Sequence, residues 1–390
     1  MYSQNTPVHL RLWNSDLWRL AIAHMLITMT TYMQVVMLPR WMNVTSLDRN
    51  ATAFAMVAFS IGLVAVGGFC NYLVQIYRRN HVCQAALILI TVVLALLYYE
   101  VHWLSAIPLQ WRLPGILFMR FLYGAAFGLS QMTLLSTLVI DVSESSQRTE
   151  ANYGVAWFGR FGMALGTIAA CYIQKVFTFE YVVFASAACS LLSFILIQRV
   201  EFPFKAPEEN VCKYSLDRFF LTEGWLLFLN LLLVTIVMGI VLSKQLELSF
   251  FCTMTVGFFL SLIAEKYVFA DADLRSETVV GHILILAALL ILHFKPDVSP
   301  YVPPLFLGFS IGIIGARFLL FSIMLSHHCQ RGTSQSSIFL SWELGISVGL
   351  TVGYLSAERY TDVIGMVLIA LSLGLYHFVT HSWYLSNKKR

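Results

Sequence analysis

Twelve long apolar segments run through the chain, and they limit its fold more than any other feature. A helix that crosses a bilayer needs about 20 mostly apolar residues, because it rises about 1.5 Å per residue through about 30 Å of hydrocarbon. The segments lack strict alternation of apolar and polar residues, and they are too long for the strands of a membrane barrel. We therefore predict an all-α integral membrane protein with twelve transmembrane helices. These helices are expected near residues 17–39, 52–77, 81–101, 114–140, 151–174, 178–198, 224–243, 247–269, 277–294, 303–326, 336–357 and 361–384.

The composition excludes a protein that is surrounded by water on all sides. Of the 390 residues, 58% are hydrophobic and 12% are charged, whereas an ordinary soluble domain carries about 25% charged residues to cover its surface. The seven cysteines show no C-x-x-C spacing, so neither a disulfide framework nor a zinc site is indicated. A net charge of +4 is not a nucleic-acid signature. We expect no metal, no cofactor and no nucleic-acid partner.

The distribution of Lys and Arg between the connections predicts the orientation of the chain. With both termini on one side, that side carries fifteen of the 25 basic residues and the opposite side carries seven, while three fall inside spans. Because cytoplasmic loops carry an excess of Lys and Arg, both termini are expected in the cytoplasm, in a multi-pass protein of a bacterial inner membrane. The seven residues expected on the outer side are Arg40, Arg49, Arg112, Lys175, Lys244, Lys295 and Arg359.

The chain repeats itself weakly on the two sides of its longest cytoplasmic connection. This connection divides it into residues 1–200 and 224–390, six predicted spans each, with a linker at 201–223. A shift of 183 residues places Arg160 on Glu343. We therefore predict two pseudo-symmetric six-helix bundles. The same shift places Gln147, Arg148, Gly162 and Gly166 on Gln330, Arg331, Gly345 and Gly349.

Two short motifs resemble those of the major facilitator superfamily. Arg120 is followed four residues later by Gly124, which is similar to the fourth-helix motif of that superfamily. The turn with Asn71, Arg78 and Arg79 is similar to its G-x-x-x-D-R-x-G-R-K loop, with Asn71 in place of the usual Asp. The chain looks most like the bacterial drug and arabinose efflux permease branch. The resemblance implies the major facilitator fold, alternating access between two bundles, and a gating role for these three loop residues.

Four charged residues fall inside the predicted spans: Arg120, Arg160, Arg317 and Glu343. A charge at mid-membrane costs at least about 2.5–3.5 kcal/mol, and it persists where it lines the bundle interior or a watery cavity. Arg160 and Glu343 have equivalent places in opposite halves, which predicts that both face a central cavity. Glu343 is expected to be the only carboxylate well inside a span, and we interpret it as the proton-coupling residue. The alternatives for these two residues are a permanent ion pair or separate pairings with backbone groups. For Arg120 the alternative is an outward-reaching side chain.

Polar and aromatic residues extend the predicted substrate cavity. His24, Thr28 and Thr31 share one helix face through the spacing i, i+4, i+7. Ordinary hydrogen bonding between helices explains such residues equally well and contributes under about 1 kcal/mol each. The excess of arginine over glutamate inside the spans favours an anionic or zwitterionic substrate. The predicted cavity residues are Arg160, Arg317, Arg120, Gln131, His24, Thr28, Thr31, Trp342 and Trp157.

These features together indicate a secondary active transporter that moves a small solute by alternating access, with proton-coupled efflux as the expected mode. Proton-coupled uptake of a sugar, peptide or organic anion stays open, and so does lipid flipping. An enzyme is not expected, because no cluster of His, Asp or Glu lies at one membrane face, and a channel would need pore-lining residues from several subunits. The expected partners are the solute, protons and membrane lipid, and a monomer suffices for the mechanism.

Overall fold

The computed structural model describes residues 12–44, 47–103, 108–144, 146–203, 211–244, 246–269, 273–294 and 298–388. All regular secondary structure within these ranges is helical. Twelve of the helical segments are long and apolar enough to cross a membrane, which confirms the predicted number of spans.

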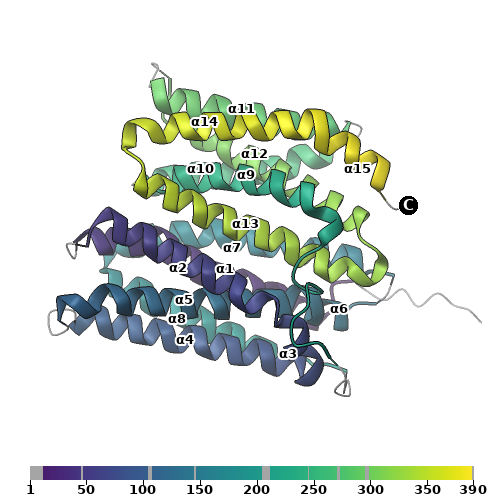
Figure 1. Cartoon of the computed structure of the whole chain (residues 1–390), viewed down its shortest axis with the longest axis horizontal. Helices are drawn as coiled ribbons and strands as arrows, with labels where there is room; N and C mark the ends of the chain where they lie inside the picture. Colours follow the sequence, from purple (N-terminus) through teal and green to yellow (C-terminus); the bar gives the residue numbers. More distant parts are fainter. Residues whose placement is uncertain are drawn as a thin grey trace, which may run out of the picture.

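The helices form two halves that lie side by side with their axes roughly parallel (Figure 1). In the first half α1 packs on α7 and α8, α2 on α5, and α4 on both α5 and α8. In the second half α9 packs on α13 and α14, while α12 packs on α10 and α11. The first half comprises α1 (Ser15–Val44), α2 (Arg49–Gly67), α3 (Cys70–Ile76), α4 (Arg79–Trp103), α5 (Leu109–Thr133), α6 (Val139–Asp141), α7 (Arg148–Val176) and α8 (Phe179–Gln198). The second comprises α9 (Trp225–Leu242), α10 (Leu248–Tyr267), α11 (Leu274–Phe294), α12 (Val302–Leu325), α13 (Arg331–Leu355), α14 (Glu358–Leu375) and α15 (His381–Asn387).

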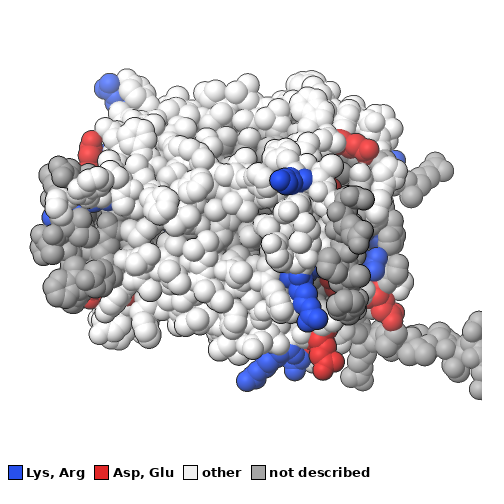
Figure 2. Space-filling view, turned by 60° about the horizontal axis from the view of Figure 1, so that its bottom comes forward, with Lys and Arg blue, Asp and Glu red and all other residues white. Residues whose placement is uncertain are grey.

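The surface explains why the chain needs a bilayer. Charged side chains gather at the two ends of the molecule, and a broad uncharged belt separates them (Figure 2). Large apolar side chains such as Phe118, Phe184 and Ile263 are exposed on the spans. Such a belt is stable only where hydrocarbon replaces water. The fold is therefore the predicted all-α arrangement of twelve spans in two six-helix bundles. The proposed bounds of the linker stay a prediction, and residues 204–210 lie outside the described ranges.

The internal repeat is visible in the helices that begin at its two markers. α7 begins at Arg148, directly after Gln147, and α13 begins at Arg331, directly after Gln330. α7 packs on α1 as α13 packs on α9. Glycines allow both approaches: a Cβ added at Gly166 would lie 2.7 Å from the Met29 carbonyl oxygen. Small residues are the usual means by which membrane helices approach closely.

The second predicted span, 52–77, is interrupted in the structure. α2 ends at Gly67 and α3 begins at Cys70. At the break, the ring of Phe219 lies where a Cβ of Gly67 would be, and the ring of Tyr214 lies against Gly68. Both rings come from the linker. The glycines therefore make room for linker side chains at this end of the molecule.

We predict that Gly349→Ala lowers the free energy of unfolding by about 1–3 kcal/mol, the usual range for overpacking. A Cβ at Gly349 would lie 2.8 Å from the Gly239 Cα and against the backbone of Ile236. The matched control is Gly374→Ala, where nothing lies within 4 Å of the added Cβ. The control should be neutral or more stable, because Ala favours helix over Gly by up to about 1 kcal/mol. Thermal unfolding in detergent measures both, and equal effects of the two substitutions would contradict the close packing of α13 on α9.

Candidate functional site

Two small cavities lie between the halves and share the side chains of Arg160 and Trp342. One has a volume of about 60 Å³ and is lined mainly by apolar residues, with Tyr32 among them. The other has a volume of about 50 Å³. The structure brings four of the nine predicted cavity residues to this second space, together with the predicted proton-coupling residue Glu343 and with Gln335, which was not predicted. Its polar lining consists of His24, Thr28, Arg160, Gln335, Trp342 and Glu343.

Arg160 is a buried cation with an unsatisfied donor. It projects from α7, is 7% exposed, and donates from Nη2 to the Gly315 carbonyl at 2.6 Å. Its guanidinium carbon lies 4.8 Å from the centroid of the Trp157 ring and 5.9 Å from that of Trp342. Its Nη1 has no hydrogen-bond partner, and among the described residues no ion pair includes Arg160. The predicted Trp157 thus supports Arg160 and does not itself line either cavity.

Two further donors on the same cavity wall have no acceptor. These are Nε2 of Gln335 and Nε1 of Trp342, both on α13 and both buried. An unsatisfied buried donor costs about 1–3 kcal/mol, so native structures keep few of them. The prediction did not include Gln335, although it lies seven residues before Trp342 and therefore on the same helix face. Three donors without partners around one small cavity are suited to a ligand that supplies acceptor oxygens.

Glu343 connects the two halves through a hydrogen bond. Its side chain is on α13 and is 3% exposed, and Tyr32 of α1 donates its hydroxyl to Oε1 at 3.3 Å. Arg160 and Glu343 line the same cavity, yet no ion pair joins these two side chains. The ion pair considered as an alternative is therefore not formed, whereas Arg160 does pair with a backbone group, the Gly315 carbonyl. Tyr32 is a further residue that the prediction of cavity residues did not include.

The remaining predicted polar residues form hydrogen bonds within the first half. His24 Nδ1 and Gln131 Oε1 are 2.6 Å apart, so Nδ1 is the donor, and Gln131 Nε2 donates to Thr28 Oγ1 at 2.9 Å. Thr31 and Tyr123 share a hydrogen bond of 3.0 Å between their hydroxyls. His24 and Thr28 reach the cavity wall, whereas Gln131 and Thr31 are buried and line neither central cavity.

Arg317 does not line either of the central cavities. It forms an ion pair with Glu277 through Nε, and its Nη2 lies 3.7 Å from Oε1 of Glu265. Glu277 lies in the first turn of α11, which begins at Leu274, and it is nevertheless only 1% exposed. A carboxylate at the end of a span is thus buried as well as Glu343, which was expected well inside one. Arg317 thus has carboxylate partners of its own.

Arg120 also lies away from the central cavities. It is 4% exposed and packs between aromatic faces of the first half, with its guanidinium carbon 4.9 Å from the Phe59 ring centroid and 5.4 Å from that of Tyr123. Cation–π contacts of this kind stabilise a cation in an apolar surrounding. The outward-reaching alternative for Arg120 is not what the structure has, because the side chain is buried.

The predicted gating residues lie where the linker crosses from one half to the other. Asn71 Oδ1 accepts a hydrogen bond of 3.1 Å from Nε of Arg218, and Arg218 Nη1 donates to the Ser136 carbonyl at 3.2 Å. The backbone NH of the same Arg218 donates to Thr333 Oγ1 of the second half at 3.0 Å. Arg79 forms an ion pair with Asp141 within the first half. Arg78 lies exposed between α3 and α4.

We call residues Tyr214–Leu221 the linker clamp. Its backbone bonds to both halves: Ser215 NH donates to the Gly68 carbonyl at 2.9 Å, and Leu221 NH donates to Ser337 Oγ at 2.5 Å. Arg218 has φ of 61°, a conformation that non-glycine residues rarely adopt and that commonly marks a functional constraint. Burial lowers the pKa of its guanidinium, and the nearby positive charge of Arg79 lowers that pKa further. These contacts could not be predicted from the sequence, since they join residues far apart in the chain.

We predict that Arg317→Met lowers the free energy of unfolding by about 3–5 kcal/mol, because it leaves Glu277 buried without its cation. The double variant Arg317→Met/Glu277→Met should recover most of this loss, since apolar groups can replace a buried ion pair. Chemical unfolding in detergent measures both. A single variant as stable as the wild type would show that Arg317 is not held in a structural ion pair.

Three solved structures of low sequence identity share the fold. The E. coli fucose:proton symporter FucP has a TM-score of 0.62 and 13% identity, over 94% of this chain and 99% of that one. A bacterial homologue of the iron transporter ferroportin in an outward-facing state has a TM-score of 0.66 and 14% identity, over 96% and 99%. The POT family transporter PepTSo has a TM-score of 0.68 and 11% identity, again over 96% and 99%.

The family assignment comes from the sequence model that matches the chain. No curated protein matches it. The family model of the Major Facilitator Superfamily, however, matches residues 20–385, which is nearly the whole length. The chain is thus a multi-pass membrane transporter and not an enzyme, and it belongs to the Major Facilitator Superfamily.

Proposed function

We propose that this protein is a proton-coupled secondary transporter for a small anionic or zwitterionic solute, which binds between the halves beside Arg160. The observation that carries the proposal is the group of three unsatisfied donors, Nη1 of Arg160, Nε2 of Gln335 and Nε1 of Trp342. A carboxylate or another oxyanion would accept hydrogen bonds from these donors and neutralise the buried guanidinium. Such charge-assisted bonds are roughly twice as strong as neutral ones.

Glu343 is the proposed proton carrier. It lines the same cavity as Arg160, with the opposite charge, and its hydrogen bond to Tyr32 crosses from one half to the other. A change in its protonation would alter both the charge of the cavity and a contact between the halves. This is the kind of link that coupling requires, because a ligand or proton shifts a conformational equilibrium only if it interacts differently with the two states.

Alternating access needs a closure on each side of the site. We assign the linker clamp as the closure at its own end, because it bonds to Gly68, Asn71 and Ser136 in the first half and to Thr333 and Ser337 in the second. From the excess of Lys and Arg at this end, we place it on the cytoplasmic side of a bacterial inner membrane, with both termini inside. One chain contains the whole site, so a monomer suffices.

Two directions of transport are compatible with this site. We propose export, on the resemblance of Arg120 and Gly124 and of the loop from Asn71 to Arg79 to motifs of the efflux branch. Uptake with protons is the second candidate, and the likeness of fold to the fucose:proton symporter supports it. The same rocking of two halves serves both directions.

We predict that succinate, offered to the purified protein at about 100 times its dissociation constant, stabilises the wild type by about 2.7 kcal/mol. In Arg160→Gln the stabilisation should be much reduced, since the cavity loses its cation. In Glu343→Gln binding should persist but lose its dependence on pH, because the titrating carboxylate is gone. Thermal unfolding against pH measures all three.

Arg199→Gln is the matched control, because it removes a positive charge from an exposed position outside the cavity. Its response should equal that of the wild type. Stabilisation by bulky lipophilic cations in place of anions would contradict the proposed substrate class. An unchanged pH dependence in Glu343→Gln would contradict the proposed proton carrier.

A further inference from the structure

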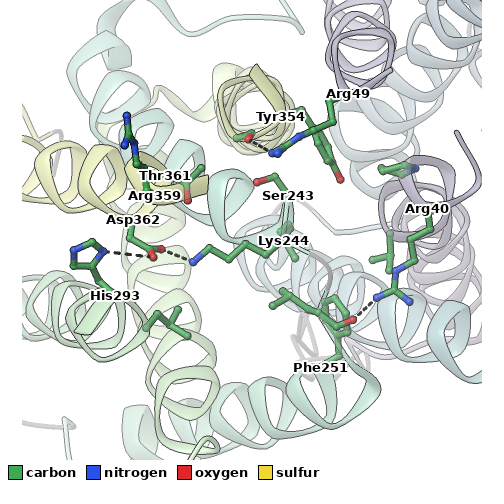
Figure 3. Close-up of a pocket in the computed structure, with 16 residues that line it drawn as sticks. Arg40, Arg49, Ser243, Lys244, Phe251, His293, Tyr354, Arg359, Thr361 and Asp362 are labelled. Atoms are coloured by element: carbon green, nitrogen blue, oxygen red, sulfur yellow. Dashed lines mark hydrogen bonds and ion pairs between the residues drawn. The ribbon is translucent and has the colours of Figure 1, made fainter. Parts of the chain in front are cut away.

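A larger cavity lies at the end of the molecule opposite the linker clamp. Its volume is about 800 Å³, within the range of about 300–1,000 Å³ that is usual for ligand sites. Both halves line it: Arg40 of α1 and Arg49 of α2 face Lys244, which follows α9, and Asp362 of α14 (Figure 3). The cavity is therefore placed to change shape when the halves move relative to each other.

The lining of this cavity is strongly cationic. It contains the four cations Arg40, Arg49, Lys244 and Arg359 and the single carboxylate of Asp362. The sequence places seven Lys and Arg residues at this end of the molecule, and four of them line this one space. Lys295, another of the seven, lies outside the described residues. The outer side of a membrane protein is ordinarily the side poor in Lys and Arg. Four basic residues around one cavity are therefore unusual at this end.

The single carboxylate of the lining, that of Asp362, already forms an ion pair. Lys244 Nζ lies 2.5 Å from Asp362 Oδ1, and His293 Nδ1 lies 3.9 Å from Oδ2 of the same residue. Asp362 is thus paired with Lys244, and it is 7% exposed. The charge of Lys244 is compensated by this pair, in which neither Arg40 nor Arg359 takes part.

Arg40 is held in place by neutral acceptors. It donates from Nη1 to Gln174 Oε1 at 3.0 Å and from Nη2 to the backbone carbonyl of Leu246. Among the described residues no carboxylate forms an ion pair with it. Arg359, on the opposite wall, is exposed and stacks on the ring of Tyr360 at 4.5 Å. These neutral contacts orient the guanidinium groups without neutralising them.

We propose that this cavity is a second oxyanion-binding site, which holds the carboxylate or phosphate group of the solute at the outer end of its route. Arg40 is the principal contact, because a guanidinium presents a planar fork of donors that matches an oxyanion. Arg359 adds positive potential across the space. Its charged residues differ from those of the central cavities, although Leu242 and Phe251 line both this cavity and the central one of about 60 Å³. The inference rests on the proposed function, whose substrate class and outer binding step it specifies.

The experiment starts from a variant in which the central cavity has lost its cation. In an Arg160→Gln background, binding of succinate and of inorganic phosphate is measured by calorimetry in detergent, with glucose as the neutral probe. We expect succinate or phosphate to bind, to bind more weakly as the salt concentration rises, and to lose about tenfold or more in affinity when Arg40→Gln is added. Glucose should not bind in either variant.

Lys175→Gln in the same background is the matched control. Lys175 is an exposed cation at the same end that does not line the cavity. An equal loss from Lys175→Gln and Arg40→Gln would overturn the inference, because it would reduce the effect to overall charge. Complete loss of anion binding in Arg160→Gln alone would overturn it too, while the central site stands. Undiminished binding in Arg160→Gln that Arg40→Gln abolishes would support the outer site and contradict the central one.

Discussion

The free-energy cost of placing a charge in a low-dielectric surrounding determines how the charged side chains within the spans of this structure are arranged. Three arginines lie within the spans, with Arg120 and Arg160 buried and Arg317 partly buried, and each is stabilised differently. Arg317 has the carboxylates of Glu277 and Glu265, and Arg120 has the faces of Phe59 and Tyr123. Arg160 has two indole rings and one carbonyl but no anion among the described residues. Arg120 and Arg160 each keep one donor without a partner, Nε and Nη1 respectively. Of the three arginines, Arg160 alone lines the cavities between the halves, which is why we propose the site there.

One helix, α13, contributes to both the proposed site and the proposed closure. α13 begins at the linker clamp, where Thr333 and Ser337 accept hydrogen bonds from linker amides. Further along, the same helix presents Gln335, Trp342 and Glu343 to the central cavity. Its close packing on α9 through Gly345 and Gly349 makes it rigid with the second half. A change in the protonation of Glu343 would therefore act on the same helix that bonds to the linker clamp.

The spans and the repeat could be predicted from the sequence because both are local properties. Hydropathy gives twelve apolar segments, and the Gln-Arg dipeptides mark the starts of α7 and α13.

The features that could not be predicted depend on contacts between residues that are distant in the sequence. Asn71 meets Arg218 across 147 positions, and Tyr32 meets Glu343 across 311. Glu277 was the first residue of the predicted span 277–294, and its burial beside Arg317 depends on a contact across 40 positions. Five predicted residues do line one cavity, and the orphaned donor of Gln335 was visible only in three dimensions.

The central claim is that the two ends of the molecule open in alternation under control of the linker clamp. Spin labels on α7 and α10 test it at both ends, with Glu150→Cys/Lys266→Cys at the clamp end and Lys175→Cys/Glu247→Cys at the other. All four positions are exposed, and exposed native cysteines are replaced beforehand. When Arg218→Ala is added, the distance at the clamp end should lengthen and the distance at the opposite end should shorten. Distances that stay unchanged, or that lengthen at both ends together, would contradict alternating access controlled by this clamp.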